Sequence, residues 1–197
     1  MSWVGLILVF SLVDNVILSR LLGISPRAGG AGSARAAVWL GVSTAVLMGF
    51  SALVGWVIDA VVLEPLRLGF LRTPAFVLSV AGLTYLLEAA AARISPLLVR
   101  TSGFSLPGVA VNCATIGIVL LTTRGGYTAA ESLIAGLAAG LGFMLVRALL
   151  AAISERLEIE RIPRALRGFP LELISAGLMA YAFMAFDRAF LARILGG

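Results

Sequence analysis

Residues 36–58 read AAVWLGVSTAVLMGFSALVGWVI and contain no charged side chain. A second run, residues 101–123, reads TSGFSLPGVAVNCATIGIVLLTT and is also free of charge. Each run has 23 residues, and roughly 20 apolar residues are enough to cross the hydrocarbon core of a bilayer. The two runs therefore predict membrane-spanning helices rather than core helices of a soluble domain.

The composition of the whole chain agrees with a membrane protein. Of its 197 residues, 60% are hydrophobic and 13% are charged, whereas soluble domains carry about 25% charged residues. Shorter uncharged runs reach spanning length if one charge near an end is tolerated by snorkelling. We therefore predict an all-α integral membrane protein with six transmembrane helices, at 3–22, 36–63, 73–92, 105–123, 128–153 and 170–192. These helices occupy one membrane domain, residues 1–197, so any large catalytic module must come from a partner.

All fifteen basic residues are arginines, and most lie near the ends of the predicted helices. This pattern indicates topology determinants and argues against a nucleic-acid-binding surface. Ten of the arginines lie in the first, third and fifth loops or in the helix ends beside them, in the stretches 20–35, 93–100 and 147–167. The positive-inside rule then places these loops in the cytoplasm and both termini outside an inner (cytoplasmic) membrane. The N-terminus has no basic stretch before its apolar run and no small-residue cleavage site, so a removable signal peptide is not expected.

Polar residues interrupt two of the predicted helices. Asp14 and Asn15 interrupt the first, and Asn112 and Cys113 interrupt the fourth. Polar groups within a bilayer are costly and usually mark a site. The two asparagines either hold helices together or satisfy backbone groups that the helix breaks release. Asp14 is either protonated, paired with Arg20, or a ligand of a coupling ion.

The sequence also repeats itself at a spacing of 96 residues. Matches of Glu, Pro and Tyr in one register are rare in a chain rich in Ala and Leu; the register pairs Met48/Met144, Asp59/Glu155, Glu64/Glu160, Pro74/Pro170 and Tyr85/Tyr181. The repeats cover about 1–96 and 97–197 and hold three predicted helices each. Because three is odd, the two halves must have opposite orientations in the membrane. Inverted repeats of this kind form sites near the bilayer midplane from interrupted helices.

The residue inventory narrows the chemistry. The chain has one cysteine and no histidine, which excludes an internal disulfide, a histidine-ligated haem and a self-contained His/Cys metal site. It shows no Gly-rich phosphate loop, nucleophile–base pair or paired catalytic carboxylates. We therefore expect no catalysis by the chain alone, and any metal must be shared with another chain. Gly136-x-x-x-Gly140 forms a small-residue face for close helix packing, against either its own chain or a partner.

Several stretches carry a resemblance to a known family. They are LVDNVILSRLLGISP at 12–26, Leu106-Pro107, VNCATIG at 111–117, Arg72-Thr73, Ser95-Pro96, Glu155-Arg156-Leu157 and AGLM at 176–179. Together they resemble the paired membrane subunits of the Rnf complex and of the sodium-pumping NADH:quinone reductase, Nqr. The resemblance covers essentially the full length and is greatest to the A-type Rnf subunit.

The resemblance implies a shared redox centre. In this family two related membrane subunits, such as the Rnf A and E types, pair as an inverted-repeat dimer and hold a two-iron, two-sulfur cluster. Each subunit contributes one cysteine after the first helix and one from the fourth. The cluster passes electrons across the bilayer between partner subunits with flavin and iron–sulfur centres, and the complex moves Na⁺ or H⁺. Here Cys113 stands at the second cysteine position and Ser25 at the first.

Ser25 leaves three possibilities open: an oxygen ligand to iron, a cluster on three cysteines plus another partner group, or no cluster. Without the resemblance, Cys113 would be read as a small buried hydrophobic residue. Two alternative functions also stay open. One is a cluster-free structural subunit of such a complex. The other is an ion or solute transporter in which Asp14, Asn15 and Asn112 form the polar site.

Overall fold

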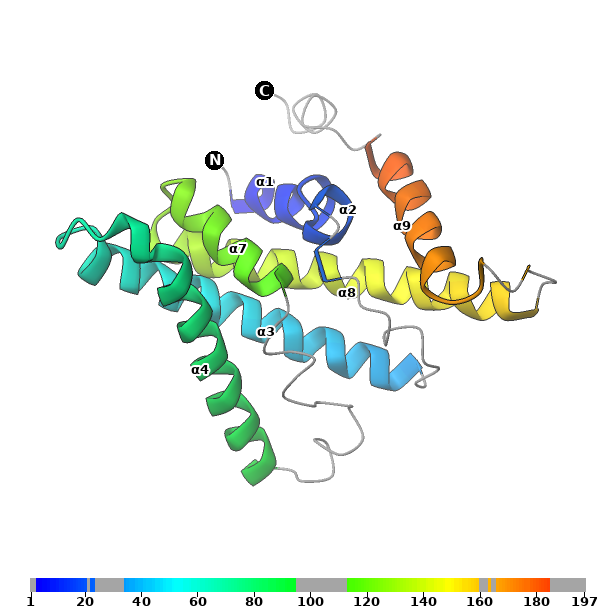
Figure 1. The fold of residues 1–197 in the computed structure, drawn as a ribbon, viewed down its shortest axis with the longest axis horizontal. Helices are drawn as coiled ribbons and strands as arrows, with labels where there is room; N and C mark the ends of the chain where they lie inside the picture. The colour runs from blue at the N-terminus through cyan, green and yellow to red at the C-terminus, as the bar shows by residue number, and fades with distance from the viewer. Residues whose placement is uncertain are drawn as a thin grey trace.

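The computed structural model describes residues 3–20, 22–23, 34–94, 113–159, 163 and 166–184. Within these ranges all regular structure is helical. The elements in chain order are α1 (Trp3–Leu8), η1 (Val9–Val13), α2 (Val16–Arg20), α3 (Ala34–Ile58), η2 (Asp59–Leu63), η3 (Gly69–Leu71), α4 (Arg72–Ile94), α7 (Cys113–Arg124), α8 (Ala129–Ile159) and α9 (Phe169–Phe183). The predicted all-α fold is therefore confirmed for the described part of the chain (Figure 1).

The described helices agree with the predicted spans in position. By length and apolar composition, three are able to cross a membrane: Gly41–Leu63, Gly69–Leu87 and Ala129–Leu157. Three shorter apolar helices, Trp3–Val13, Cys113–Arg124 and Phe169–Phe183, overlap the other predicted spans. Residues 95–112 and 185–197 lie outside the described ranges, so the start of the fourth predicted helix and the end of the sixth are untested. The chain is a multi-pass membrane protein.

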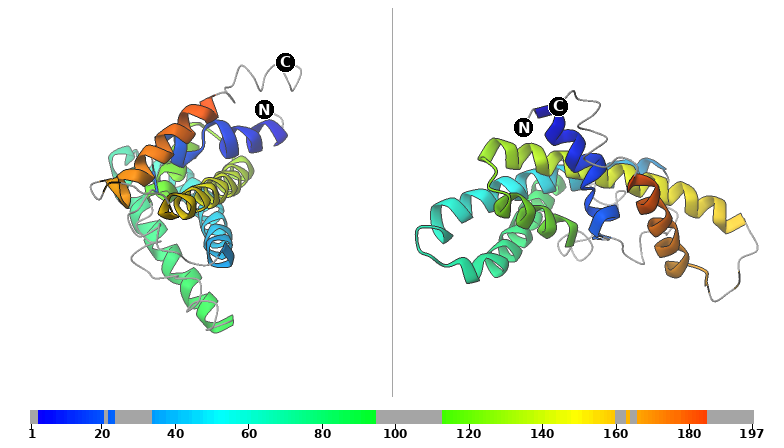
Figure 2. Two further views of the ribbon diagram at one scale, coloured as in Figure 1. Left: turned by 90° about the vertical axis from the view of Figure 1, so that its right-hand side faces the viewer. Right: turned by 90° about the horizontal axis from the view of Figure 1, so that it is seen from above.

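Helices α3 and α8 form the centre of the molecule and lie side by side along its length (Figures 1 and 2). They run antiparallel, because Gly140 of α8 meets Ala45 of α3 while Gly136 meets Gly49. A Cβ atom at Gly136 would lie 2.6 Å from the carbonyl oxygen of Met48. The Gly136-x-x-x-Gly140 face thus packs against the backbone of its own chain, which answers the question that the sequence left open.

A capping box starts helix α8. Glu131 Oε2 accepts hydrogen bonds from the backbone N–H of Thr128 at 2.9 Å and from its hydroxyl at 3.0 Å. The Thr128 hydroxyl lies 3.4 Å from the Glu131 backbone nitrogen. This Thr-x-x-Glu arrangement satisfies N–H groups that the first turn of a helix otherwise leaves without partners. It fixes where α8 begins after the short turn that follows α7.

Helices α4 and α9 lie at the edges of the bundle (Figures 1 and 2). Among the described side chains of α4, the buried ones lie on one face, where Phe76 and Val80 pack with Val119 of α7. Large apolar side chains on the outward faces stay exposed, among them Leu78 and Leu86 of α4 and Leu178 of α9. Such surfaces are costly in water and stable against lipid or another apolar helix. Their exposure is consistent with a membrane location.

Candidate functional site

The first predicted helix is interrupted where the sequence predicts a break. Segment η1 is a π-helical turn, in which the N–H of Asp14 donates to the carbonyl of Val9 at 2.7 Å. The backbone at Asp14 then leaves helical geometry, with φ −91° and ψ 39°, and α2 begins at Val16. Single π-helical turns are rare in proteins and frequent at functional sites. The predicted interruption of the first helix is confirmed.

Asn15 holds this break together from a fully buried position. Its Oδ1 accepts the backbone N–H of Ile17 at 3.1 Å, which makes Asn15 the N-cap of α2. Its Nδ2 donates to the carbonyl of Ser11 at 3.0 Å, in the last turn before the break. The hydroxyl of Ser19 donates to the Asn15 carbonyl at 2.8 Å. The amide therefore serves both half-helices, which is the supporting role that the sequence suggested for it.

The end of the first interrupted helix meets the start of α7. The backbone N–H of Gly23 donates to Sγ of Cys113 at 3.1 Å. A Cβ atom at Gly117, one turn along α7, would lie 2.7 Å from Cδ1 of Leu22. Two segments 90 residues apart in the sequence are thus in direct contact at the cysteine.

The surroundings of Cys113 indicate whether its thiol is able to bind a metal. Cys113 is exposed, is the first residue of α7, and carries a free thiol. A soft thiolate sulfur suits iron, and hydrogen bonds to the sulfur are among the features that set cluster potentials. The arrangement fits one ligand of a shared cluster. The described part of the chain has no group of three His, Cys, Asp or Glu able to hold a metal by itself. Ser25 and Asn112 lie outside the described residues.

A cavity of about 620 Å³ opens between the first interrupted helix and α9. Leu12, Val13 and Asp14 line it at the helix break, with Ser19 from α2. Tyr181 belongs to the opposite wall, on α9. Asp14 is thus one of the residues that line this cavity. The sequence predicted that Asp14 interrupts the first helix, but it did not predict the cavity.

Arg147 of α8 and Glu172 of α9 form an ion pair that the sequence did not predict. Arg147 Nη1 and Glu172 Oε1 are 3.9 Å apart, and the side chains are 15% and 9% exposed. Arg147 lies ten residues before Leu157, the last residue of the apolar span, or about 15 Å along the helix. Charged side chains at such depth usually face the bundle interior and pair with one another. Glu172 also lies in the first turn of α9, where a carboxylate is favoured by the positive end of the helix dipole.

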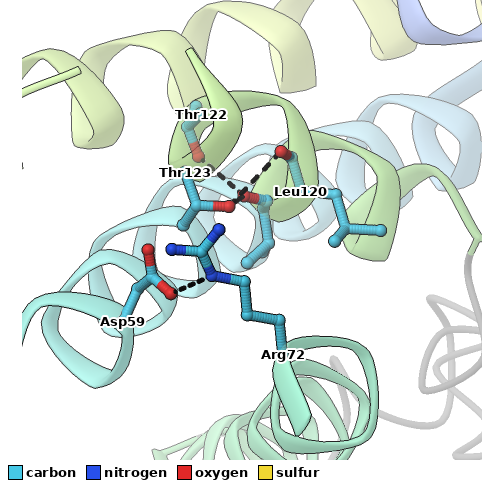
Figure 3. Close-up of polar contacts among 6 residues, drawn as sticks. Asp59, Arg72, Leu120, Thr122 and Thr123 are labelled. Atoms are coloured by element: carbon cyan, nitrogen blue, oxygen red, sulfur yellow. Dashed lines mark hydrogen bonds and ion pairs between the residues drawn. The ribbon is translucent and has the colours of Figure 1, made fainter. Parts of the chain in front are cut away.

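A second ion pair joins the end of α3 and η2 to the start of α4. Arg72 Nε and Asp59 Oδ1 are 2.6 Å apart, with side chains 38% and 12% exposed. Figure 3 shows the two side chains pointing toward each other, with Thr122 and Thr123 of α7 beside them. Both threonine hydroxyls donate to carbonyl oxygens of their own helix. This pair closes the loop between two spans; its carboxylate is about as buried as Glu172, but its arginine is more exposed than Arg147.

Comparison with known proteins identifies the family. Residues 4–189 match the family model described as "Rnf-Nqr subunit, membrane protein". The chain is 41% identical to the A-type subunit of the Na(+)-translocating ferredoxin:NAD(+) oxidoreductase complex of Acetobacterium woodii, over 89% of this chain and 91% of that protein. It is 38% identical to the A-type subunit of the ion-translocating oxidoreductase complex of Cronobacter sakazakii, with the same coverage. It is 39% identical to the Escherichia fergusonii protein of that name, again over 89% and 91% of the two chains.

A match over nearly the whole chain agrees with the stretches that carried the resemblance and with the apolar helices that the structure describes. The protein belongs to the Rnf-Nqr family of membrane subunits.

Proposed function

We propose that this chain is the A-type membrane subunit of an ion-translocating ferredoxin:NAD⁺ oxidoreductase complex. The names of its relatives support this assignment, as does identity of about 40% along almost the whole chain. Its partners would be a paralogous membrane subunit, together with further subunits that carry flavin and iron–sulfur centres. The chain has no catalytic role by itself. It helps carry electrons across the inner membrane while the complex moves Na⁺ or H⁺.

Cys113 is the residue that we assign to electron transfer. We infer that its thiolate ligates one iron of a two-iron, two-sulfur cluster shared with the paralogous subunit. The hydrogen bond from Gly23 N–H to Cys113 Sγ, at 3.1 Å, carries this proposal. It supports the idea that the ends of the two interrupted helices meet at one point. Ser25 follows Gly23 by two residues and is the candidate for the second position, in the place of the family cysteine.

The bound cluster would supply a one-electron carrier near the middle of the membrane. The chain's own residues would position and insulate it. Asn15 holds the helix break that ends near Gly23, and the Gly23 N–H stabilises negative charge on the sulfur. Asn112, which precedes Cys113, would support the corresponding break of the fourth helix.

The architecture that we propose is six spans in two inverted repeats, with both termini outside. A shift of 96 residues relates Thr44 to Gly140 and therefore makes α3 and α8 equivalent helices. These helices run antiparallel. Gly140 contacts Ala45, which follows Thr44, the residue equivalent to Gly140 in the first repeat. Such a crossing is what a two-fold axis in the membrane plane requires. The crossing thus favours a duplicated scaffold.

The test is chemical and spectroscopic analysis of the complex purified with its native partners. We expect a two-iron paramagnetic resonance signal in the reduced wild-type complex and its loss in Cys113→Ala. Ser25→Cys should keep the signal and change its shape, because a harder oxygen ligand or a non-ligand is replaced by sulfur. Glu64→Gln, an exposed loop residue, is the control.

Iron fully accounted for by the partner subunits, and unchanged by Cys113→Ala, would contradict the cluster and favour a structural subunit. Uptake of an ion or solute by the purified chain without its partners would instead favour a transporter.

A further inference from the structure

The helix break contains a carboxylate that the fold does not use as a cap. Asn15, not Asp14, caps α2, and Asn15 also bonds to the preceding turn. The backbone N–H of Asp14 is the only part of this residue in the π-helical hydrogen bond to Val9. An asparagine in place of Asp14 would preserve that backbone bond, so neither the cap nor the π-helical turn requires a carboxylate at this position.

The charge lies at membrane depth. Asp14 follows Trp3, a residue type typical of the membrane interface, by 11 positions. That separation is about 16 Å along a helix, or roughly half of the 30 Å hydrocarbon core. Ionisable residues at this depth usually mark an ion pathway.

The surroundings of Asp14 offer further oxygen atoms. Leu12 and Val13 line the same cavity and belong to the last turn of a half-helix, where carbonyl groups lack successors to bond with. The Ser19 hydroxyl donates its hydrogen to the carbonyl of Asn15 at 2.8 Å, which leaves its oxygen lone pairs for another partner. The C-terminal end of a half-helix also carries partial negative charge. All of these features favour a cation.

The cavity is large enough to admit one. Its volume of about 620 Å³ holds roughly 20 water molecules at about 30 Å³ each. A cation therefore need not lose its whole hydration shell on entry. The α9 wall has no side chain at Gly177 and only a methyl group at Ala180, and Tyr181, 79% exposed, places a phenol at that wall.

We propose that Asp14 and the broken turn at Leu12–Val13 form a binding site for a small monovalent cation, which enters through the cavity between the first interrupted helix and α9. This inference rests on the proposed function, since it assigns an ion site to an ion-translocating complex. The single carboxylate matches a single positive charge. Ca²⁺ takes six to eight oxygen ligands, several from carboxylates, and the described residues offer no such cluster. An ionised carboxylate accepts about four contacts, so the cation is able to share Asp14 with a protein donor.

The experiment compares wild type with Asp14→Asn, Asp14→Glu and Glu64→Gln in the purified complex. The first arm measures equilibrium binding of ²²Na⁺ at fixed pH. If Na⁺ is the cation, Asp14→Asn raises the half-saturating Na⁺ concentration by about tenfold or more, whereas Asp14→Glu and Glu64→Gln retain binding. The second arm, in Na⁺-free buffer, follows the infrared band of a protonated carboxyl group as the pH is lowered. If the cation is a proton, that band is absent in Asp14→Asn.

Unchanged ²²Na⁺ binding together with an unchanged carboxyl band in Asp14→Asn would overturn the site. Asp14→Glu keeps the negative charge, so it tests the site even if the complex with Asp14→Asn fails to assemble. If a well-assembled Asp14→Glu complex binds no ²²Na⁺ and shows no carboxyl band that responds to pH, the proposed cation site is also overturned. The paramagnetic resonance signal is recorded on the same samples. If Asp14→Asn leaves both cation binding and the paramagnetic resonance signal unchanged, the cation site has failed while the cluster assignment stands.

Discussion

The backbone N–H of Gly23 donates to Sγ of Cys113 across 3.1 Å, although 90 residues separate the two in the sequence. Gly23 ends the first interrupted helix with a φ of +88°, and Cys113 begins α7. The contact joins the two halves of the chain at the one residue able to supply a thiolate. In the role proposed for Cys113, this hydrogen bond from the backbone would hold the sulfur in a fixed geometry.

Gly23→Ala tests this relationship. The left-handed backbone of Gly23 is strained for a residue with a Cβ, at a cost of about 1–2 kcal/mol. We expect the segment to relax and the hydrogen bond to Cys113 to weaken. Because hydrogen bonds to sulfur favour the more negative, reduced form of an iron–sulfur cluster, the midpoint potential of the proposed cluster should fall. Redox titration of the paramagnetic signal is the measurement. Gly82→Ala is the control, since Gly82 has nothing within 4 Å of an added Cβ. Equal potentials in the two variants would argue against the contact.

Gly140→Ala tests the packing of α3 on α8. An added Cβ would collide with the backbone of Ala45, which cannot rotate away. Overpacking typically costs about 1–3 kcal/mol, so we expect a clearly lower free energy of unfolding and a lower midpoint in a thermal melt of the detergent-solubilised complex. Gly177→Ala adds the same methyl group to α9 where nothing lies within 4 Å. A melt of Gly140→Ala that matches that of Gly177→Ala would contradict the close approach.

Thr128→Ala removes the cap of α8. The substitution deletes the hydroxyl that pairs with Glu131, although the backbone N–H of Thr128 still reaches the carboxylate. Loss of an N-cap side chain costs about 0.5–2 kcal/mol. The expected result is a lower thermal midpoint for Thr128→Ala and a value close to wild type for Thr128→Ser, which retains the hydroxyl. A melt of Thr128→Ser as low as that of Thr128→Ala would show that the hydroxyl is not what stabilises the helix start.

The interrupted first helix could be predicted from sequence because its signal is local. An apolar run long enough to span a bilayer contains Asp14 and Asn15 at its centre, and a bilayer offers no water to satisfy such groups. Asn15 is also a preferred N-cap residue, so a helix start at Val16 follows from the residue type. The same holds for Thr128 and Glu131, whose spacing is a capping-box signature. In each case the interacting groups lie within four residues of one another.

The remaining features depend on which helices become neighbours. Arg147 and Glu172 lie 25 positions apart on different helices, and each alone has an ordinary explanation at a helix end or in a first turn. The Gly136 and Gly140 face was visible, but a small-residue stripe is compatible with any partner helix. The cavity beside Asp14 requires α9 to lie across from the break, and no residue pattern encodes that distance.

The coupling energy between Arg147 and Glu172 should exceed that between Arg72 and Asp59, because Arg147 is more buried than Arg72. Either single change, Arg147→Leu or Glu172→Leu, leaves a charge buried among apolar helices, and removal of one partner of a buried pair costs about 3–5 kcal/mol. The double variant leaves no orphaned charge, so we expect its thermal stability to lie above that of both single variants. A double-mutant cycle on unfolding of the complex measures the difference. The same cycle on Asp59 and Arg72 should give a smaller coupling energy, because Arg72 is 38% exposed and solvent screens its charge. Additive effects at Arg147 and Glu172 would show that the 3.9 Å approach does not hold α9 on α8.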